Sequence, residues 1–265
     1  MDPSLPLRGR EILVTREAKA ADIMADTIRK YGGIPQIVPL ISFRPFEDEM
    51  ESTYVDKLKS YDWIFFTSKN GVHFFFDRLK EHHLTLAGSR TKFAAVGEKT
   101  CDALKEYGIQ ADFVPELYSA VNFSEEFLEQ VSEVGKVLLS KGNLAKDTIA
   151  VRFKEKGITI DEWITYETFF PKDHVRKLIT LLQDRELAAI TFTSPSTVKR
   201  FMKIVREHHL EYALEGLTAA CIGPVTKEAA DQYGLAVQIV PEKYTVEEMI
   251  EGLAGYFTLK DKREE

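Results

Sequence analysis

The chain has 265 residues, of which 44% are hydrophobic and 29% are charged, and its formal net charge at pH 7 is −7. This length accommodates one large domain or two smaller domains, each with its own core. The acidic balance argues against a nucleic-acid surface, because domains that bind nucleic acid are usually basic. No apolar run approaches the roughly 18 residues that a membrane-spanning helix needs. The first eight residues lack the apolar core of a signal peptide, and two cysteines suit a reducing compartment, so we expect a cytoplasmic protein.

Short apolar runs alternate with segments of helical periodicity along the chain. The expected strands cover residues 12–14, 64–66, 93–96, 137–139, 190–192 and 219–222. Each half of the chain reads as strand, helix, strand and then twice more strand and helix. Glycines follow Tyr31, Tyr107 and Tyr233, where the preceding helices are expected to end. This alternation predicts an α/β fold with parallel sheets that helices cover on both faces.

The two halves of the chain resemble each other at a nearly fixed spacing. With an offset of 126 residues and no gap, Ser68, Gly97, Thr100 and the run Val114-Pro115-Glu116 align with Ser194, Gly223, Thr226 and Val240-Pro241-Glu242. Upstream, residues 11–33 match residues 136–158 at an offset of 125. The pattern indicates a tandem duplication of one unit rich in strand–helix pairs.

Two extended segments are candidates for crossings between domains. Residues 38–46 and 163–172 are rich in β-branched and aromatic residues, and Pro39, Pro45 and Pro171 prevent helix at their ends. We expect these segments to run side by side as a two-stranded linker. The charged tail, residues 260–265, is expected to be disordered.

Residues that could bind a ligand follow the expected strands, because ligands of doubly wound sheets bind outside the carboxyl ends of the strands. Hydroxyl side chains there cap helices, glycines let a ligand approach the backbone, and free N–H groups attract carboxylate or phosphate oxygens. A cap without any ligand is the competing interpretation for each single loop. The candidate binding residues are Thr15, Arg16, Thr67, Ser68, Lys69, Asn70, Gly97, Thr100, Ser140, Lys141, Ser194, Ser196, Gly223 and Thr226.

Several common catalytic and cofactor motifs are missing from the sequence. There is no phosphate-binding G-x-x-x-x-G-K-[ST], no G-x-G-x-x-G after a strand and no G-x-S-x-G. The histidine pairs at 82–83 and 208–209 fall at expected helix ends, where adjacent side chains do not face each other, so a metal site is not expected. Cys101 and Cys221 are interpreted as small buried hydrophobic residues. We therefore expect an activity that needs no metal and no cofactor.

Taken in order, these segments resemble the uroporphyrinogen-III synthase family. The matching stretches are "ILVTRE", "IFFTSKNGVHFF", "AAVGEKT", "LLSKGN", "TYETFFP", "ITFTSPSTVKRF", "CIGPVTKEAADQYGL" and "VPEKYTVEEMI". One departure is Glu17, which follows Arg16 where the family often has proline. The resemblance implies two flavodoxin-like α/β domains joined by a two-stranded ladder. One domain would comprise residues 1–38 and 172–265, the other residues 46–165, with 39–45 and 166–171 as linkers.

The resemblance also implies a reaction and a set of partners. Family members cyclise hydroxymethylbilane, a linear tetrapyrrole, with inversion of the last ring and loss of water, to give uroporphyrinogen III. Tyr166, in "TYETFF", matches a family tyrosine proposed to assist departure of the hydroxyl, and Thr100 and Thr226 match threonines near the cleft. The expected protein is a monomer that binds this small-molecule substrate and has transient contact with the upstream hydroxymethylbilane synthase. It would bind neither nucleic acid nor membrane.

Other functions remain open from the sequence. Duplicated α/β lobes with two crossings also suit a non-catalytic protein that closes around a small anion, or a regulator that has kept the fold and lost the activity. A nucleotide-dependent sugar or phosphate enzyme is disfavoured by the missing phosphate-binding loops. The sequence does not identify which hydroxyl, if any, acts as an essential acid.

Overall fold

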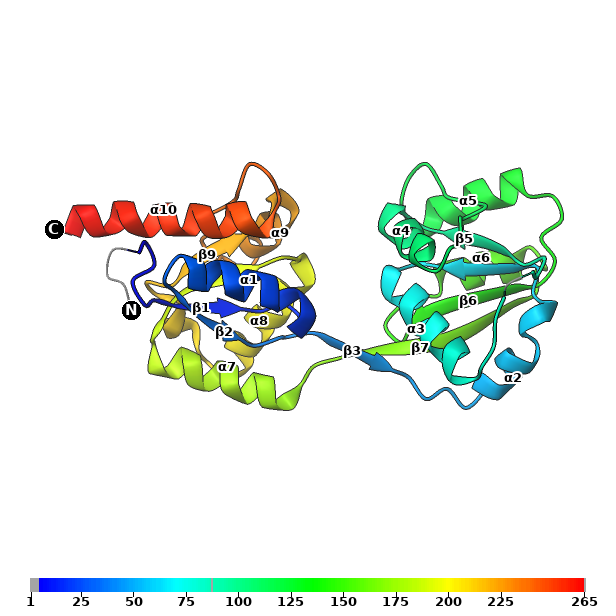
Figure 1. Ribbon diagram of the computed structural model, residues 1–265, viewed down its shortest axis with the longest axis horizontal. Coiled ribbons are helices and arrows are strands. Elements are labelled where there is room, and N and C mark those ends of the chain that lie inside the picture. Colours follow the sequence, from blue (N-terminus) through cyan, green and yellow to red (C-terminus); the bar gives the residue numbers. More distant parts are fainter. Residues whose placement is uncertain (1–4, 87, 265) are drawn as a thin grey trace. The chain divides into compact units, whose positions relative to one another are not determined.

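The computed structural model describes residues 5–86 and 88–264 (Figure 1). Contacts divide the chain into two compact units. Unit 1 combines Met1–Ser42 with Phe169–Glu265, and unit 2 is the continuous stretch Phe43–Thr168. The two cuts fall within residues 39–45 and 166–171. Residues 1–4 of the expected first domain lie outside the described residues.

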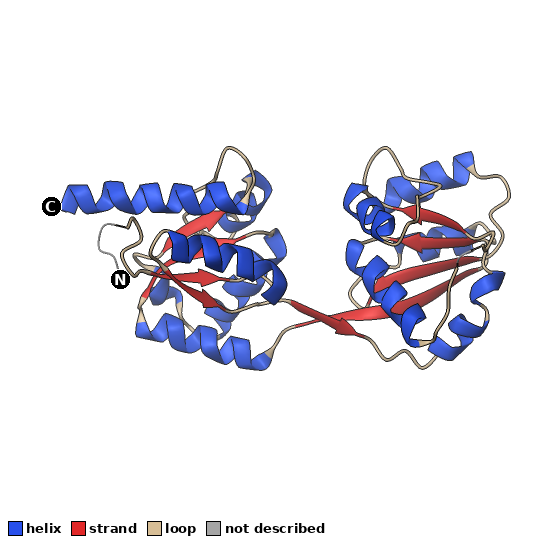
Figure 2. Cartoon of the chain, viewed as in Figure 1, coloured by secondary structure: helices blue, strands red, loops and turns tan. Residues whose placement is uncertain are grey.

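Unit 1 contains a parallel sheet of four strands in the order β2-β1-β8-β9. Figure 2 shows strands in red and the helices that surround them in blue. The strands are β1 (Glu11–Val14), β2 (Ile34–Ile37), β8 (Leu187–Phe192) and β9 (Thr218–Cys221). The helices are α1 (Ala18–Lys30), α7 (Lys172–Asp184), α8 (Pro195–Glu207), α9 (Pro224–Asp231) and α10 (Val246–Glu264), with a short 3-10 helix, η2 (Glu211–Leu214). A parallel bridge between Ala220 and Ile239 extends the sheet at the β9 edge.

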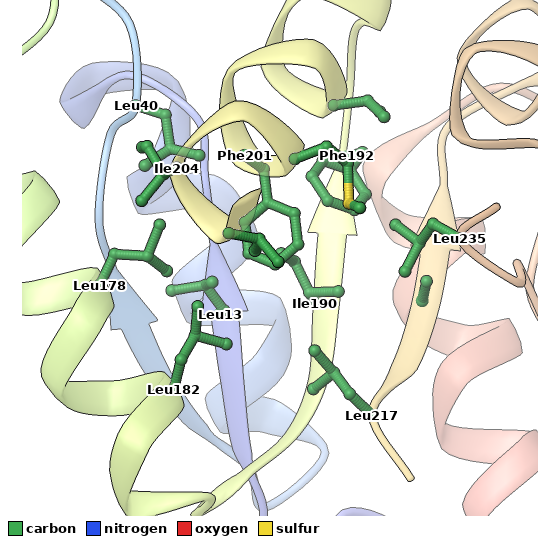
Figure 3. Close-up of a cluster of buried hydrophobic side chains, with 14 of the residues drawn as sticks. Leu13, Leu40, Leu178, Leu182, Ile190, Phe192, Phe201, Ile204, Leu217 and Leu235 are labelled. Atoms are coloured by element: carbon green, nitrogen blue, oxygen red, sulfur yellow. The ribbon is translucent and has the colours of Figure 1, made fainter. Parts of the chain in front are cut away.

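Both faces of this sheet are buried, as the continuous apolar strands predict. Leu13 and Ile190 belong to one hydrophobic cluster, which Phe201 of α8 and Leu178 of α7 complete (Figure 3). Ile12, on the opposite face of β1, belongs to a second cluster, with residues of α1 and α10. Alternate residues of one strand therefore pack against different helical layers.

Unit 2 contains a sheet in the order β3-β7-β6-β4-β5. Its strands are β3 (Ser42–Pro45), β4 (Trp63–Phe66), β5 (Lys92–Ala95), β6 (Val137–Gly142) and β7 (Ile160–Phe169). Its helices are α2 (Glu51–Asp56), α3 (Lys69–Glu81), α4 (Glu98–Glu106), α5 (Ala120–Gln130) and α6 (Thr148–Glu155), with the 3-10 helix η1 (Leu58–Ser60). The pairs β4–β5, β4–β6 and β6–β7 are parallel, and β3 lies beside β7 at the edge of the sheet.

Aromatic side chains dominate one core of unit 2. Phe65 lies 5.0 Å from Phe123, 4.8 Å from Phe127 and 5.3 Å from Phe153 between ring centroids, in edge-to-face arrangements. Such pairs are favoured because the positive edge of one ring meets the negative face of another. They fasten α5 and α6 to one face of the sheet, and the carboxyl ends of the strands are thereby held in place.

Several local features recur in the two units at the offset of 126 residues. His82 and His208 are the C-caps of α3 and α8, and each is followed by a histidine with positive φ, His83 at 53° and His209 at 55°. The expected left-handed glycines at helix ends are confirmed, with φ of 73° at Gly108. Within the described residues no group of histidine, cysteine or acidic side chains is arranged to hold a metal ion.

The expectation of a disordered tail is wrong for residues 260–264, because α10 extends to Glu264. Arg10 donates a hydrogen bond to Asp261 at 2.5 Å, and its guanidinium lies 4.6 Å from the ring centre of Phe257. The ion pair with Arg10 and the buried ring of Phe257 thus hold the last turns of α10 in place. The charged composition of the tail gave no indication of these contacts. Glu265 lies outside the described residues. Every helix in the described part of the chain is too short or too polar to cross a bilayer.

Candidate functional site

Each sheet has one point at which the strand order reverses. In unit 1 it lies between β1 and β8, and in unit 2 between β6 and β4. Ligands of doubly wound sheets bind in the crevice outside the carboxyl ends of such strands, because the loops that follow them diverge to opposite faces. These two edges carry most of the candidate residues.

In unit 2 two serines at this edge form separate hydrogen-bonded groups. Ser68 is the N-cap of α3, and its hydroxyl accepts a hydrogen bond from the backbone N–H of Gly71 at 3.0 Å. The same oxygen lies 3.0 Å from the hydroxyl of Tyr166. Ser140 is fully buried; it donates to the carbonyl of Gly71 at 3.1 Å and lies 3.0 Å from the hydroxyl of Thr165. Ser68 and Ser140 thus hold the first turn of α3 beside Tyr166.

Tyr166 owes its position to an irregularity in β7. The register between β6 and β7 shifts so that Lys141 pairs with Ile164 but Gly142 pairs with Tyr166. The tyrosine ring fills the space above Gly142, where an added Cβ would lie 2.6 Å from its Cζ. Phe74 of α3 stacks on the ring with a centroid distance of 5.3 Å, and Tyr166 is only 8% exposed. The phenol is therefore a fixed side chain that faces Ser68.

Lys141 occupies a different environment from the one expected of a substrate-binding cation. Its ammonium donates hydrogen bonds to Asp147 at 2.6 Å and Glu162 at 2.8 Å. Burial, the largest single effect, lowers the pKa of Lys141, but the hydrogen bonds and the charge attraction to Asp147 and Glu162 together raise it, so that its pKa lies above the ordinary value. Burial likewise raises the pKa of Glu162, but hydrogen bonds from Lys141 and Lys154 and the charge attraction to both together lower it below its ordinary value. The charge of Lys141 is neutralised inside unit 2, and the geometry assigns it to tying β6 to β7.

In unit 1 the corresponding edge also carries a cluster of hydroxyls. Thr15 is buried and donates to the carbonyl of Thr191 in the adjacent strand at 2.8 Å. Ser194 is the N-cap of α8; its hydroxyl accepts from the backbone N–H of Thr197 at 3.3 Å and lies 3.0 Å from the hydroxyl of Ser196. Thr15 therefore has a structural partner. Ser194 repeats the capping role of Ser68, but among the described residues its hydroxyl has no tyrosine as a hydrogen-bond partner.

The glycine candidates begin the next pair of helices. Gly97 and Gly223 are the N-caps of α4 and α9, and neither helix has a side-chain cap. The third residues of these helices, Thr100 and Thr226, are buried. The remaining candidates lie at the same edges: Arg16, Thr67 and Asn70 are half-buried and Lys69 is exposed.

Several residues at these edges were not identified from the sequence. Gly142 and Phe74 confine the ring of Tyr166. Tyr118 and Tyr244 lie against Gly97 and Gly223. Tyr118 and Tyr244 each lie two residues after a Val-Pro-Glu run, at the same offset of 126 residues. This repeated position is a signal by which the sequence could have identified them.

Two hollows within the units lie away from these residues. In unit 2, Gly135, Lys136 and Thr159, which precede β6 and β7, line a cavity of 1020 Å³. In unit 1, residues 216–218, at the start of β9, line one of 580 Å³. Both hollows are at the amino ends of the strands, whereas the hydroxyl clusters are at the carboxyl ends.

Comparison with known proteins identifies the family. The family model described as "Uroporphyrinogen-III synthase HemD" matches residues 22–251, most of the chain. The "Porphyrin biosynthesis protein HemD" of Ruminiclostridium josui is 35% identical over 94% of this chain, which spans about half the length of that protein, 49%. A "Putative uroporphyrinogen-III synthase" of Methanocaldococcus jannaschii is 28% identical over 95% of this chain and 100% of its own length.

Solved structures show the same fold. A mutant uroporphyrinogen III synthase from Thermus thermophilus covers 95% of this chain and 100% of its own length with a TM-score of 0.69, at 19% sequence identity. The uroporphyrinogen-III synthetase of Helicobacter pylori covers 94% of this chain and 99% of its own length with a TM-score of 0.54, at 18% identity. The chain belongs to the uroporphyrinogen-III synthase family, whose members are cyclising lyases of tetrapyrrole biosynthesis.

Proposed function

We propose that this protein converts hydroxymethylbilane into uroporphyrinogen III. The observation that carries the proposal is the Tyr166–Ser68 hydroxyl pair, held at the reversal point of a sheet in a member of the synthase family. The substrate is a chain of electron-rich pyrroles with a terminal hydroxymethyl group, so the protein has to supply orientation and one acid rather than a strong electrophile.

The proposed reaction begins with breakage of the bond between the terminal carbon and its hydroxyl. The hydroxyl takes up a proton and leaves as water, while a pyrrole nitrogen supplies the electron pair that forms an azafulvene. The substituted carbon of the last ring attacks this azafulvene to give a spiro intermediate. That intermediate fragments and closes again with the last ring inverted. Held in one folded conformation, the substrate cannot close directly to the symmetric isomer.

Tyr166 is the proposed proton donor to the departing hydroxyl. Its ring is fixed by Phe74 and Gly142, so the phenol is oriented before the substrate binds. Ser68 lies 3.0 Å from the phenol oxygen and can hydrogen-bond to it before and after the proton moves. Such a positioned acid accelerates a reaction without any metal.

The carboxylates of the substrate require hydrogen-bond donors, and the first turns of helices are suited to supply them. α3, α4, α8 and α9 begin at the carboxyl ends of strands, with their first N–H groups and the positive ends of their dipoles at these edges. Backbone donors bind anions locally, so the overall charge of −7 is no obstacle. We further propose that the protein works in the cytoplasm as a monomer and receives its substrate from the upstream synthase through transient contact.

Isomer analysis tests the proposal directly. Freshly generated hydroxymethylbilane is mixed with the purified protein without added metal or nucleotide, the products are oxidised, and type I and type III porphyrins are separated by chromatography. Type III should dominate. The type I isomer alone, as in buffer without protein, would contradict the proposal and leave a small-anion-binding or regulatory protein of the same fold.

A further inference from the structure

Two exposed tyrosines lie on glycines at the carboxyl edges of the two sheets. In unit 2 a Cβ added at Gly97 would lie 3.2 Å from Cγ of Tyr118, so that the tyrosine ring covers the glycine. In unit 1 a Cβ added at Gly223 would lie 3.3 Å from Cγ of Tyr244. Each glycine begins a helix, and each tyrosine follows 21 residues later. The same arrangement is thus built twice.

Contact with the tyrosine rings, and not the backbone conformation, explains why glycine occupies positions 97 and 223. Gly97 has φ of −167° and Gly223 has φ of −174°, an extended conformation that any residue adopts. A methyl group at either position would press on the tyrosine at less than the usual carbon–carbon contact distance of about 3.5–4.0 Å. Glycine therefore provides the room in which the ring lies.

The outer surfaces of both rings face solvent. Tyr118 is 61% exposed and Tyr244 is 63% exposed, although each packs against a glycine on one side. In the described part of the chain, neither phenol hydroxyl has a hydrogen-bond partner. Two exposed apolar side chains are close to these tyrosines or glycines in the sequence. Leu117 directly precedes Tyr118, and Val225 lies in the first turn of α9, which Gly223 caps. Large aromatic residues that are seated on one side and open on the other are typical of sites that bind flat ligands.

We propose that the surface at Tyr118 in unit 2 and, separately, the surface at Tyr244 in unit 1 each bind a pyrrole ring of a tetrapyrrole, and that the tyrosine hydroxyls donate hydrogen bonds to its carboxylates. This inference rests on the proposed function. A pyrrole ring offers the flat π-surface that an exposed aromatic ring stacks on, and its acetate and propionate groups reach a hydroxyl at the ring edge. The tyrosines touch the substrate away from the bond that breaks, so they contribute mainly to binding.

The test measures KM and kcat for hydroxymethylbilane in Tyr118→Ala, Tyr118→Phe, Tyr244→Ala and Tyr244→Phe. We expect each alanine variant to raise KM about tenfold, equivalent to about 1.4 kcal/mol, and to change kcat less than twofold. Each phenylalanine variant keeps the ring on its glycine and should raise KM about threefold. Tyr212→Ala is the matched control, because Tyr212 is 51% exposed in η2, away from the carboxyl edge; it should leave both constants unchanged.

Thermal unfolding of each variant separates binding from folding. The phenylalanine variants should unfold at the wild-type temperature, so that their KM reports contact with the substrate alone. Wild-type KM values in both phenylalanine and both alanine variants would overturn the inference. So would a raised KM only in variants that also unfold at lower temperature, since the tyrosines would then be structural covers of the glycines. Failure of the proposed function itself is distinguishable, because the wild-type protein would then yield no type III isomer.

Discussion

Gly142 is expected to be a position at which a single methyl group disturbs both stability and activity. An added Cβ would lie 2.6 Å from Cζ, 2.7 Å from Cε2 and 2.8 Å from the hydroxyl oxygen of Tyr166. Normal contacts need about 3.5–4.0 Å, so the ring has to move by about 1 Å. Phe74 stacks on the ring and the side chain is buried, which leaves little room for that movement.

The expected loss of stability follows from these contacts. Overpacking of a filled core costs about 1–3 kcal/mol. A shift of about 1 Å also breaks the 3.0 Å hydrogen bond between Tyr166 and Ser68, which adds about 0.5–1.5 kcal/mol. Gly142→Ala should therefore lower the free energy of unfolding of unit 2 by about 2–4 kcal/mol and reduce kcat, because the phenol is no longer in position.

A double-mutant cycle in urea tests this reasoning. Unfolding is followed for the wild type, Gly142→Ala, Tyr166→Ala and the double variant. Once the ring is removed, the methyl group has space, so Gly142→Ala should cost little in the Tyr166→Ala background. Gly255→Ala is the control for the substitution itself, because a Cβ there meets nothing within 4 Å and lies in α10; it should be neutral or stabilising by up to about 1 kcal/mol. An equal cost of Gly142→Ala in both backgrounds would refute the argument.

Four further variants address the hydroxyl pair, its counterpart cap in unit 1 and the ion pair of Lys141. Tyr166→Phe should slow turnover several-fold and leave the protein folded, measured by initial rates and circular dichroism; full activity would remove Tyr166 from catalysis. Ser68→Ala should lower the free energy of unfolding by about 1 kcal/mol through loss of an N-cap, and it should also slow turnover. Ser194→Ala removes the corresponding cap in unit 1, so it should cost similar stability but have a smaller effect on kcat. Equal kcat losses would argue against the pairing of Ser68 with the phenol. Lys141→Met should destabilise unit 2 by about 2 kcal/mol, because Glu162 is left without its main partner. The pKa of Glu162 is lowered in the folded state, so the ionised carboxylate stabilises the fold. This contribution to the free energy of unfolding is fully present above the ordinary carboxyl pKa of about 4.3 and is lost as the pH falls through the lowered value. Urea midpoints between pH 7 and pH 3 should fall less in Lys141→Met than in the wild type; equal slopes would contradict this assignment.

Much of the architecture was predictable from local sequence. Apolar runs such as residues 64–66 and 190–192 become buried parallel strands, because only strands covered on both faces tolerate continuous hydrophobic residues. Ser68 and Ser194 cap the helices that follow, and Gly108 ends a helix with positive φ. These features depend on residues close together in the chain, so their signals are legible in the sequence.

The candidate site depended on contacts between distant residues. Nothing in the order of residues indicates that Tyr166 is seated on Gly142 by a shift in strand register, or that Lys141 is neutralised by Glu162. The same holds for the tail, where an ion pair to Arg10 keeps helical a segment whose charge suggested disorder.

The sequence alone determined the α/β class, the helix caps and the family to which the chain belongs, because periodicity, capping and motif order are local properties. The tertiary structure decided which side chains at the strand ends are engaged within their own unit and which are exposed. Thr15 and Lys141 are engaged by partners within their units, whereas Tyr118 and Tyr244 stay open. Burial and hydrogen bonding arise only when strands far apart in the chain are brought side by side, and no local pattern encodes that outcome.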